Sequence, residues 1–78
     1  MRPIRTGYSN ITYVADGCGD LSATLFEDQS GNYEVETVWE LTDEEVEQIR
    51  KEKKLYLYIQ GGQVPPLLIS AESYVEVK

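Results

Sequence analysis

Alternating apolar and polar positions in the first half of the chain predict three short β-strands. Residues 11–15 are mostly β-branched or aromatic, and residues 21–25 and 33–39 alternate between apolar and polar types. Polar turns rich in glycine separate these strands at residues 16–20 and 28–32. Short strands joined by tight turns usually pair with their neighbours, so we expect an antiparallel meander. The alternation in residues 21–25 predicts a single buried face for that strand.

The stretch after the third strand carries the signals of a capped α-helix. Thr42 and Glu45 have the spacing of a capping box, in which each side chain bonds the other residue's backbone N–H. Acidic residues follow in the first turn and basic residues in the last, as the helix dipole favours. These signals predict a short helix over about 43–52, with Val46 and Ile49 forming a narrow apolar stripe.

Residues 55–59 alternate cleanly and predict a fourth strand, with two tyrosines on its outer face. The positions expected to face the core are Leu55, Leu57 and Ile59, whereas Tyr56 and Tyr58 would face away. Beyond a glycine turn, Pro65 and Pro66 lack the N–H that a sheet ladder needs. We therefore expect residues 67–69 to form a short buried strand near an edge. Residues 73–77 have the composition of one more strand.

The length and pattern together predict one small domain spanning residues 1–78. Its predicted class is α+β, with an antiparallel sheet of four to six strands and one short helix packed on it. A chain of 78 residues buries only roughly 60–65% of the surface that its unfolded form exposes, so the core should be small. No run of 18 apolar residues is present, so we expect no membrane span. The first five residues are followed by a polar run and not by an apolar one, so no secretory signal is visible and we expect a cytoplasmic protein.

The side chains needed for most catalysis and metal binding are missing. The chain has no histidine, and Cys18 is its one cysteine. A cysteine nucleophile paired with histidine is therefore impossible, as is a Ser-His-Asp triad. Structural zinc needs about four cysteine or histidine ligands. We expect no enzyme activity, no cofactor and no metal.

Charge is distributed unevenly along the chain. The net charge is −7, and residues 16–48 contain eleven acids and no base. Such a middle section argues against direct nucleic-acid binding, which needs clustered Lys and Arg. Glu34, Glu36 and Glu40 share one face of the third predicted strand, where a row of carboxylates would imitate a line of phosphates. The ordinary alternative is a solvated outer face of the sheet.

The tyrosines give a second candidate binding surface. Six tyrosines in 78 residues is a high proportion, and Tyr56 and Tyr58 are expected on the face of the sheet that points away from the core. Tyrosine is common in interfaces because it provides a large contact area at low entropic cost. The alternative is that an N-terminal segment or the helix covers both rings.

One part of the chain resembles a known group of proteins. Residues 39–69 are similar to a pattern in small proteins of unknown function encoded by tailed bacteriophages and prophages. The resemblance implies a phage accessory protein that acts in the host bacterial cytoplasm by binding a host protein. The residues that carry it are Trp39, Leu41, Thr42, Glu44, Glu45, Ile49, Leu55, Leu57, Ile59, Gly61, Pro65 and Pro66.

These observations favour a non-enzymatic protein that acts by protein–protein binding, as an inhibitor or modulator of a host protein. Two alternatives stay open. One is a structural or assembly component of a virion, or a homo-oligomeric accessory protein. The other is a nucleic-acid mimic that uses the acidic face. Edge strands near Pro65 or at the chain ends favour a homodimer, since unpaired edges readily pair across a two-fold axis.

Overall fold

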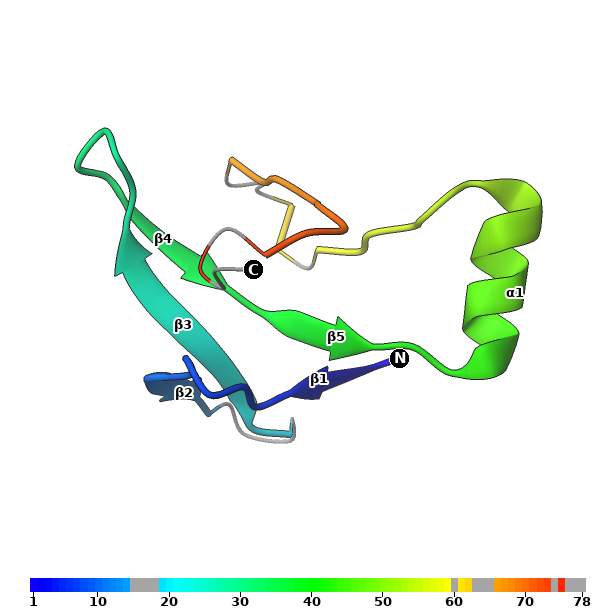
Figure 1. Ribbon diagram of the computed structural model, residues 1–78, viewed down its shortest axis with the longest axis horizontal. Coiled ribbons are helices and arrows are strands. Elements are labelled where there is room, and N and C mark those ends of the chain that lie inside the picture. The colour runs from blue at the N-terminus through cyan, green and yellow to red at the C-terminus, as the bar shows by residue number, and fades with distance from the viewer. Residues whose placement is uncertain (15–18, 60, 63–65, 74, 76–78) are drawn as a thin grey trace.

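The computed structural model describes residues 1–14, 19–59, 61–62, 66–73 and 75. Within these residues the chain forms two antiparallel sheets and one helix (Figure 1). The elements are β1 (Arg2–Ile4), β2 (Ile11–Tyr13), β3 (Leu21–Glu27), β4 (Tyr33–Glu36), β5 (Val38–Glu40) and α1 (Asp43–Glu52). The predicted α+β class is confirmed.

Strands β2, β3 and β4 form the predicted meander, with β3 in the middle. Ile11 lies opposite Ala23, and Leu25 lies opposite Val35. The side chain of Asn10 prolongs the ladder by one position. Its Oδ1 accepts from the Leu25 N–H at 2.8 Å, and its Nδ2 donates to the Leu25 carbonyl at 3.0 Å. An amide side chain thus takes the place of the backbone where β2 has not yet begun. The first strand is shorter than predicted, because it ends at Tyr13.

The predicted turn at residues 28–32 is confirmed, and Asp28 organises it. The Asp28 carboxylate accepts from the backbone N–H groups of Ser30 and Asn32 at 2.9 and 3.0 Å. Gly31 has a φ of 84°, which a residue with a Cβ adopts only under strain. Asp28 and Gly31 therefore account for the tight reversal between β3 and β4. The other predicted turn, at residues 16–20, lies mostly outside the described residues.

The prediction of one strand over residues 33–39 is wrong, because the strand breaks at Thr37. β4 stays in the three-stranded sheet, whereas β5 pairs with β1 in a separate two-stranded sheet. Figure 1 shows β5 continuing from β4, with β3 alongside the first and β1 alongside the second. At the break, the Thr37 hydroxyl accepts a hydrogen bond from the Trp39 indole at 3.0 Å. The Thr37 side chain therefore bonds a residue two positions away, and at this point the chain passes from the three-stranded sheet to the two-stranded sheet.

β1 was not expected from the sequence, because it is only three residues long and contains Pro3. Proline is compatible with an edge strand, where its missing N–H is not needed. In the β1–β5 pair Pro3 lies opposite Trp39, and Arg2 lies opposite Glu40. β1 also contacts β3, so the N-terminal strand links the two sheets.

The buried core of the described residues is confined to the centre of β3. Ala23 is 2% exposed and Thr24 is 5% exposed, and no other described residue is buried. These two neighbours point to opposite faces of the strand, so β3 is covered on both sides at its centre. The prediction of a single buried face is therefore wrong. Leu25, expected on that face, is 40% exposed.

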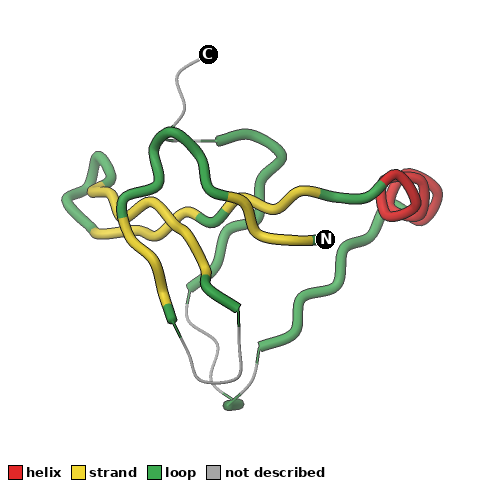
Figure 2. The backbone as a smooth tube through the Cα atoms, turned by 90° about the horizontal axis from the view of Figure 1, so that it is seen from below, coloured by secondary structure: helices red, strands yellow, loops and turns green. Residues whose placement is uncertain are grey.

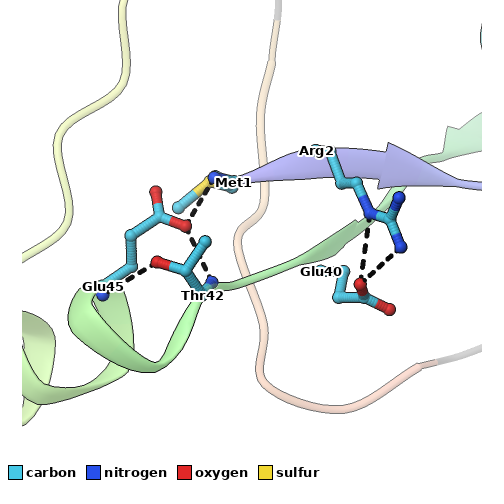
Figure 3. Close-up of polar contacts among 5 residues, drawn as sticks. All are labelled: Met1, Arg2, Glu40, Thr42 and Glu45. Carbon is cyan, nitrogen blue, oxygen red and sulfur yellow. Dashed lines mark hydrogen bonds and ion pairs between the residues drawn. The ribbon is translucent and has the colours of Figure 1, made fainter.

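The helix is confirmed over Asp43–Glu52, and so is its capping box. The Thr42 hydroxyl accepts from the Glu45 N–H at 3.2 Å, and the Glu45 carboxylate accepts from the Thr42 N–H at 2.9 Å. Figure 3 shows that the N-terminus joins this cap, since the Met1 amino group lies 2.5 Å from the same Glu45 oxygen. The adjacent Arg2 guanidinium donates twice to the Glu40 carboxylate. β1 thus fixes the point where the chain leaves β5 and enters α1.

Of the three strands predicted after the helix, the two whose residues are all described do not form. Residues 55–59 and 67–69 are irregular, and their apolar side chains do not face a core. Leu55 and Leu57 are 49% and 56% exposed, and Leu68 is 66% exposed. For the strand predicted over residues 73–77, residues 74, 76 and 77 lie outside the described residues, and Ser73 and Val75 belong to no strand.

The end of α1 provides a test of backbone strain. Lys53 adopts a φ of 55° while its N–H donates to the Ile49 carbonyl at 2.6 Å. A Cβ is unfavourable in this left-handed region, by about 1 kcal/mol. Lys53→Gly should therefore raise the free energy of unfolding by about that amount, measured by urea titration. Lys53→Ala is the control, because it shortens the side chain and keeps the Cβ. An equal gain in both variants would contradict the strain argument.

The N-terminal contact of Glu45 predicts a pH dependence. The Met1 amino group and then the Thr42 N–H hold the pKa of Glu45 below its usual value of 4.5. A lowered pKa in the folded state stabilises the fold above the unfolded pKa, and this contribution disappears as the pH falls. Stability should therefore drop as the pH goes below about 4.5. Glu45→Gln retains a capping side chain without the charge, so its stability should change less over the same acidic range. Identical acid titrations of the two proteins would exclude this role for the carboxylate.

Candidate protein-binding surfaces

Both tyrosines of the predicted binding face are open to solvent. Tyr56 is 66% exposed and Tyr58 is 88% exposed. Figure 1 shows the segment after α1 returning as an extended chain toward the sheets, without joining either of them. The alternative that an N-terminal segment or the helix covers these rings is therefore wrong. Of the two alternatives that the sequence left open, the structure shows exposed rings, although no strand holds them.

We call residues 55–59 the LYLYI segment. Its apolar side chains are exposed as well as its tyrosines. Its backbone groups form no hydrogen bond with any other described residue. An extended, unpaired chain rich in β-forming side chains is suited to add as a strand to the edge of another sheet. The exposed apolar side chains of this segment are Leu55 at 49%, Leu57 at 56% and Ile59 at 39%.

A groove of about 320 Å³ lies where the LYLYI segment leaves the helix. Its apolar lining comes from Met1, Ile49, Leu55 and Tyr56. Its charged lining includes Glu44, Glu45, Glu52 and Lys54. The sequence pattern did not reveal this groove, because it depends on the N-terminus meeting the helix at Glu45.

The predicted acidic row is divided among three separate local interactions. Glu40 belongs to β5 and accepts from Arg2 at 2.7 and 3.1 Å. Glu36 belongs to β4, and its carboxylate accepts from the Ser73 hydroxyl at 2.7 Å. Glu34 lies next to Asp28. The expectation that the three acids share one face of one strand is wrong, because the break at Thr37 places Glu40 in the other sheet.

The contact between Glu34 and Asp28 shifts the two carboxyl groups in opposite directions. The hydrogen bond and negative charge of Asp28 raise the pKa of Glu34. The pKa of Asp28 is lowered, mainly by the N–H of Asn32, which donates to its carboxylate. Asp28 is therefore the stable anion of the turn. Once ionised, Glu34 lies beside a carboxylate of like charge.

The structure adds little about the other candidate sites. Cys18 lies outside the described residues. No three acidic or cysteine side chains are grouped to hold a metal ion within the part of the chain that is described. The same part contains no helix with the length and apolar character needed to cross a membrane.

Comparison with protein-family models, with curated proteins and with solved structures finds no match. The phage resemblance of residues 39–69 therefore remains an expectation that rests on the sequence pattern.

The acid pair predicts opposite effects for two matched substitutions. A raised pKa means that Glu34 favours the fold only below its ordinary pKa, and this contribution is lost as the pH rises through the raised value. Glu34→Gln should therefore increase stability at pH 7, and the gain should shrink in acid. Asp28→Asn should decrease stability at pH 7, since the N–H groups of Ser30 and Asn32 lose a charged acceptor. Urea midpoints at neutral and acidic pH measure both changes. A loss of stability in Glu34→Gln at pH 7 would contradict the assignment.

Proposed function

We propose that this chain is a non-enzymatic binding protein that modulates a partner protein through its LYLYI segment. The observation that carries the proposal is the exposure of all five side chains of residues 55–59, together with a backbone that bonds no other described residue. Tyrosine and leucine exposed on a chain that is ready to pair as a strand offer both side-chain and main-chain contacts. Such a segment is unfavourable in water unless something covers it.

The accessible surface of the chain supports this proposal. It amounts to 7094 Å², whereas a folded monomer of 8.9 kDa exposes roughly 4,800 Å². The difference of about 2,300 Å² exceeds the roughly 800 Å² that each partner contributes to a standard interface. The protein therefore has enough uncovered surface for a stable contact, and this surface includes the LYLYI segment.

The acidic residues are a weaker basis for recognition. Glu36 and Glu40 already accept hydrogen bonds from Ser73 and Arg2. The carboxyl group of Glu34 contacts that of Asp28. A nucleic-acid mimic needs carboxylates that are free to meet a basic surface. We therefore favour the tyrosines over the acids as the contact.

The resemblance of residues 39–69 to small phage-encoded proteins gives the proposal its biological setting. In that setting the partner is a host protein, and the site of action is the bacterial cytoplasm. The absence of histidine and the presence of one cysteine leave few catalytic groups, which is consistent with action by binding alone. A virion component would instead be recovered with purified particles.

The test compares capture of a bacterial partner by the wild type and by a double variant, Tyr56→Ala with Tyr58→Ala. We expect the double variant to bind at least roughly 30-fold more weakly, because truncating a central interface tyrosine costs about 2 kcal/mol or more. Tyr33→Ala is the matched control, since Tyr33 is 74% exposed but lies on β4. The control should bind as the wild type does.

A second variant, with Gln in place of Glu34, Glu36 and Glu40, separates the two surfaces. It should retain binding, and added salt should have little effect on the wild type. Binding that survives the double tyrosine substitution and disappears with moderate salt or with the Gln variant would overturn the proposal in favour of the acidic residues.

A further inference from the structure

The main chain of the LYLYI segment is available for pairing along its whole length. None of its backbone groups bonds another described residue, and its five residues are all exposed. Figures 1 and 2 show the chain between α1 and residue 59 as an extended loop that lies apart from the strands of both sheets. Each residue therefore keeps one backbone donor and one acceptor that no described residue satisfies.

Two residues with left-handed backbone conformation limit the part of the chain that is able to pair. Lys53 has a φ of 55° and Gly61 a φ of 97°. A β-strand needs a φ of about −120 to −140°. A strand formed here therefore begins after Lys53 and ends before Gly61, and residues 54–59 are its described part. This length matches the usual strand of about five to six residues.

The LYLYI segment lacks the features that keep exposed strands from pairing. Natural proteins protect exposed strand edges with charged side chains, with proline or with very short strands. Residues 55–59 contain no charged side chain and no proline. In a strand, its leucines and its isoleucine would lie on one face and its tyrosines on the other. A sheet edge that receives this strand therefore needs apolar or aromatic side chains on both faces.

The sheets of a second copy do not offer such an edge. The outer strands of the described sheets are β1, β2, β4 and β5. β1 contains Arg2 and Pro3, and β4 contains Glu34 and Glu36. β2 and β5 are only three residues long. Each outer strand thus has one of the protective features. Two LYLYI segments paired with each other would form a two-stranded ribbon, which is at best marginally stable in water.

We infer that the partner of the LYLYI segment is another protein with an open β-sheet edge, and that residues 54–59 join this edge as an added strand. The inference rests on the proposed function and gives the partner its chemistry. The partner's edge supplies backbone donors and acceptors, which account for affinity. Apolar side chains on the two faces of that edge contact the leucines, the isoleucine and the tyrosines, which accounts for specificity.

An added strand has a signature that side-chain contacts alone do not produce. Along an edge strand, the backbone groups of alternate residues point toward the neighbouring strand, and those of the residues between them point away. The N–H groups of Leu55, Leu57 and Ile59 therefore form one set, and those of Tyr56 and Tyr58 form the other. One set bonds the partner, and the other does not.

The experiment replaces the N–H of each residue from 55 to 59 by an ester oxygen, one residue at a time. The α-hydroxy acid with the same side chain is incorporated, so the side-chain contacts stay unchanged. Because these N–H groups bond no described residue, the urea midpoint of each free variant should equal that of the wild type. An ester at Leu68 is the control, since Leu68 is 66% exposed and lies outside the segment.

The probe is the protein that the wild type captures from bacterial lysate, purified and titrated calorimetrically against each variant. Esters in one set should weaken binding at least about fivefold each, because a carbonyl of the partner loses its donor. Esters in the other set only weaken the preceding carbonyl as an acceptor, so their loss should stay below about threefold. The Leu68 ester should bind as the wild type does.

The pattern of losses separates this inference from the proposed function. Five esters with equal effects, or with none, would overturn the inference. If the double tyrosine variant still binds weakly in that case, the segment binds through its side chains and the proposed function stands. If that variant also binds as the wild type does, or if the wild type captures no protein, the proposed function fails too. Alternating losses in self-association of the wild type, without the captured protein, would make a second copy the occupant and contradict the inference.

Discussion

The shortage of buried apolar surface governs the rest of this structure. Two neighbouring residues of β3, Ala23 and Thr24, are the buried core of the described chain, while large apolar side chains from β3 to residue 69 stay open to solvent. Apolar burial is the main favourable term in folding, so a chain that covers so little of its surface has little stability to spare. Strand pairing, turns and caps hold the sheets and the helix in shape. We propose that another protein covers the remaining apolar surface.

The N-terminus connects these local structures. β1 pairs with β5 and contacts β3, and the charges at its start meet Glu45 and Glu40 at the entry to α1 (Figure 3). Exposed ion pairs contribute little stability individually, but here they are placed where two sheets and a helix meet. They lie where the chain leaves β5 and enters α1, and no residue of α1 is buried. The LYLYI segment follows α1 and is also exposed.

The sequence predicted those features that depend on neighbouring residues. The capping box at Thr42 and the turn at Asp28 arise from side chains that bond nearby backbone groups, so their spacing is sufficient. Features that depend on distant pairing were missed. Alternation in residues 55–59 indicates a segment that fits a sheet, but it does not say whether a strand is available to pair with it. The separation of Glu40 from the other acids was missed for the same reason. After the break at Thr37, β5 pairs with β1, and alternation does not predict a pairing between strands so far apart in the chain. For Tyr56 and Tyr58 the sequence left exposed and covered rings as alternatives, and the structure shows them exposed on a segment that forms no strand.

We propose that association with a partner protein completes the burial that the single chain lacks. The most direct measurement is urea unfolding of the wild type with increasing amounts of the protein that it captures. Because a partner that binds only the folded form stabilises it by mass action, the midpoint should rise with partner concentration. A midpoint that does not change with partner concentration would contradict the account.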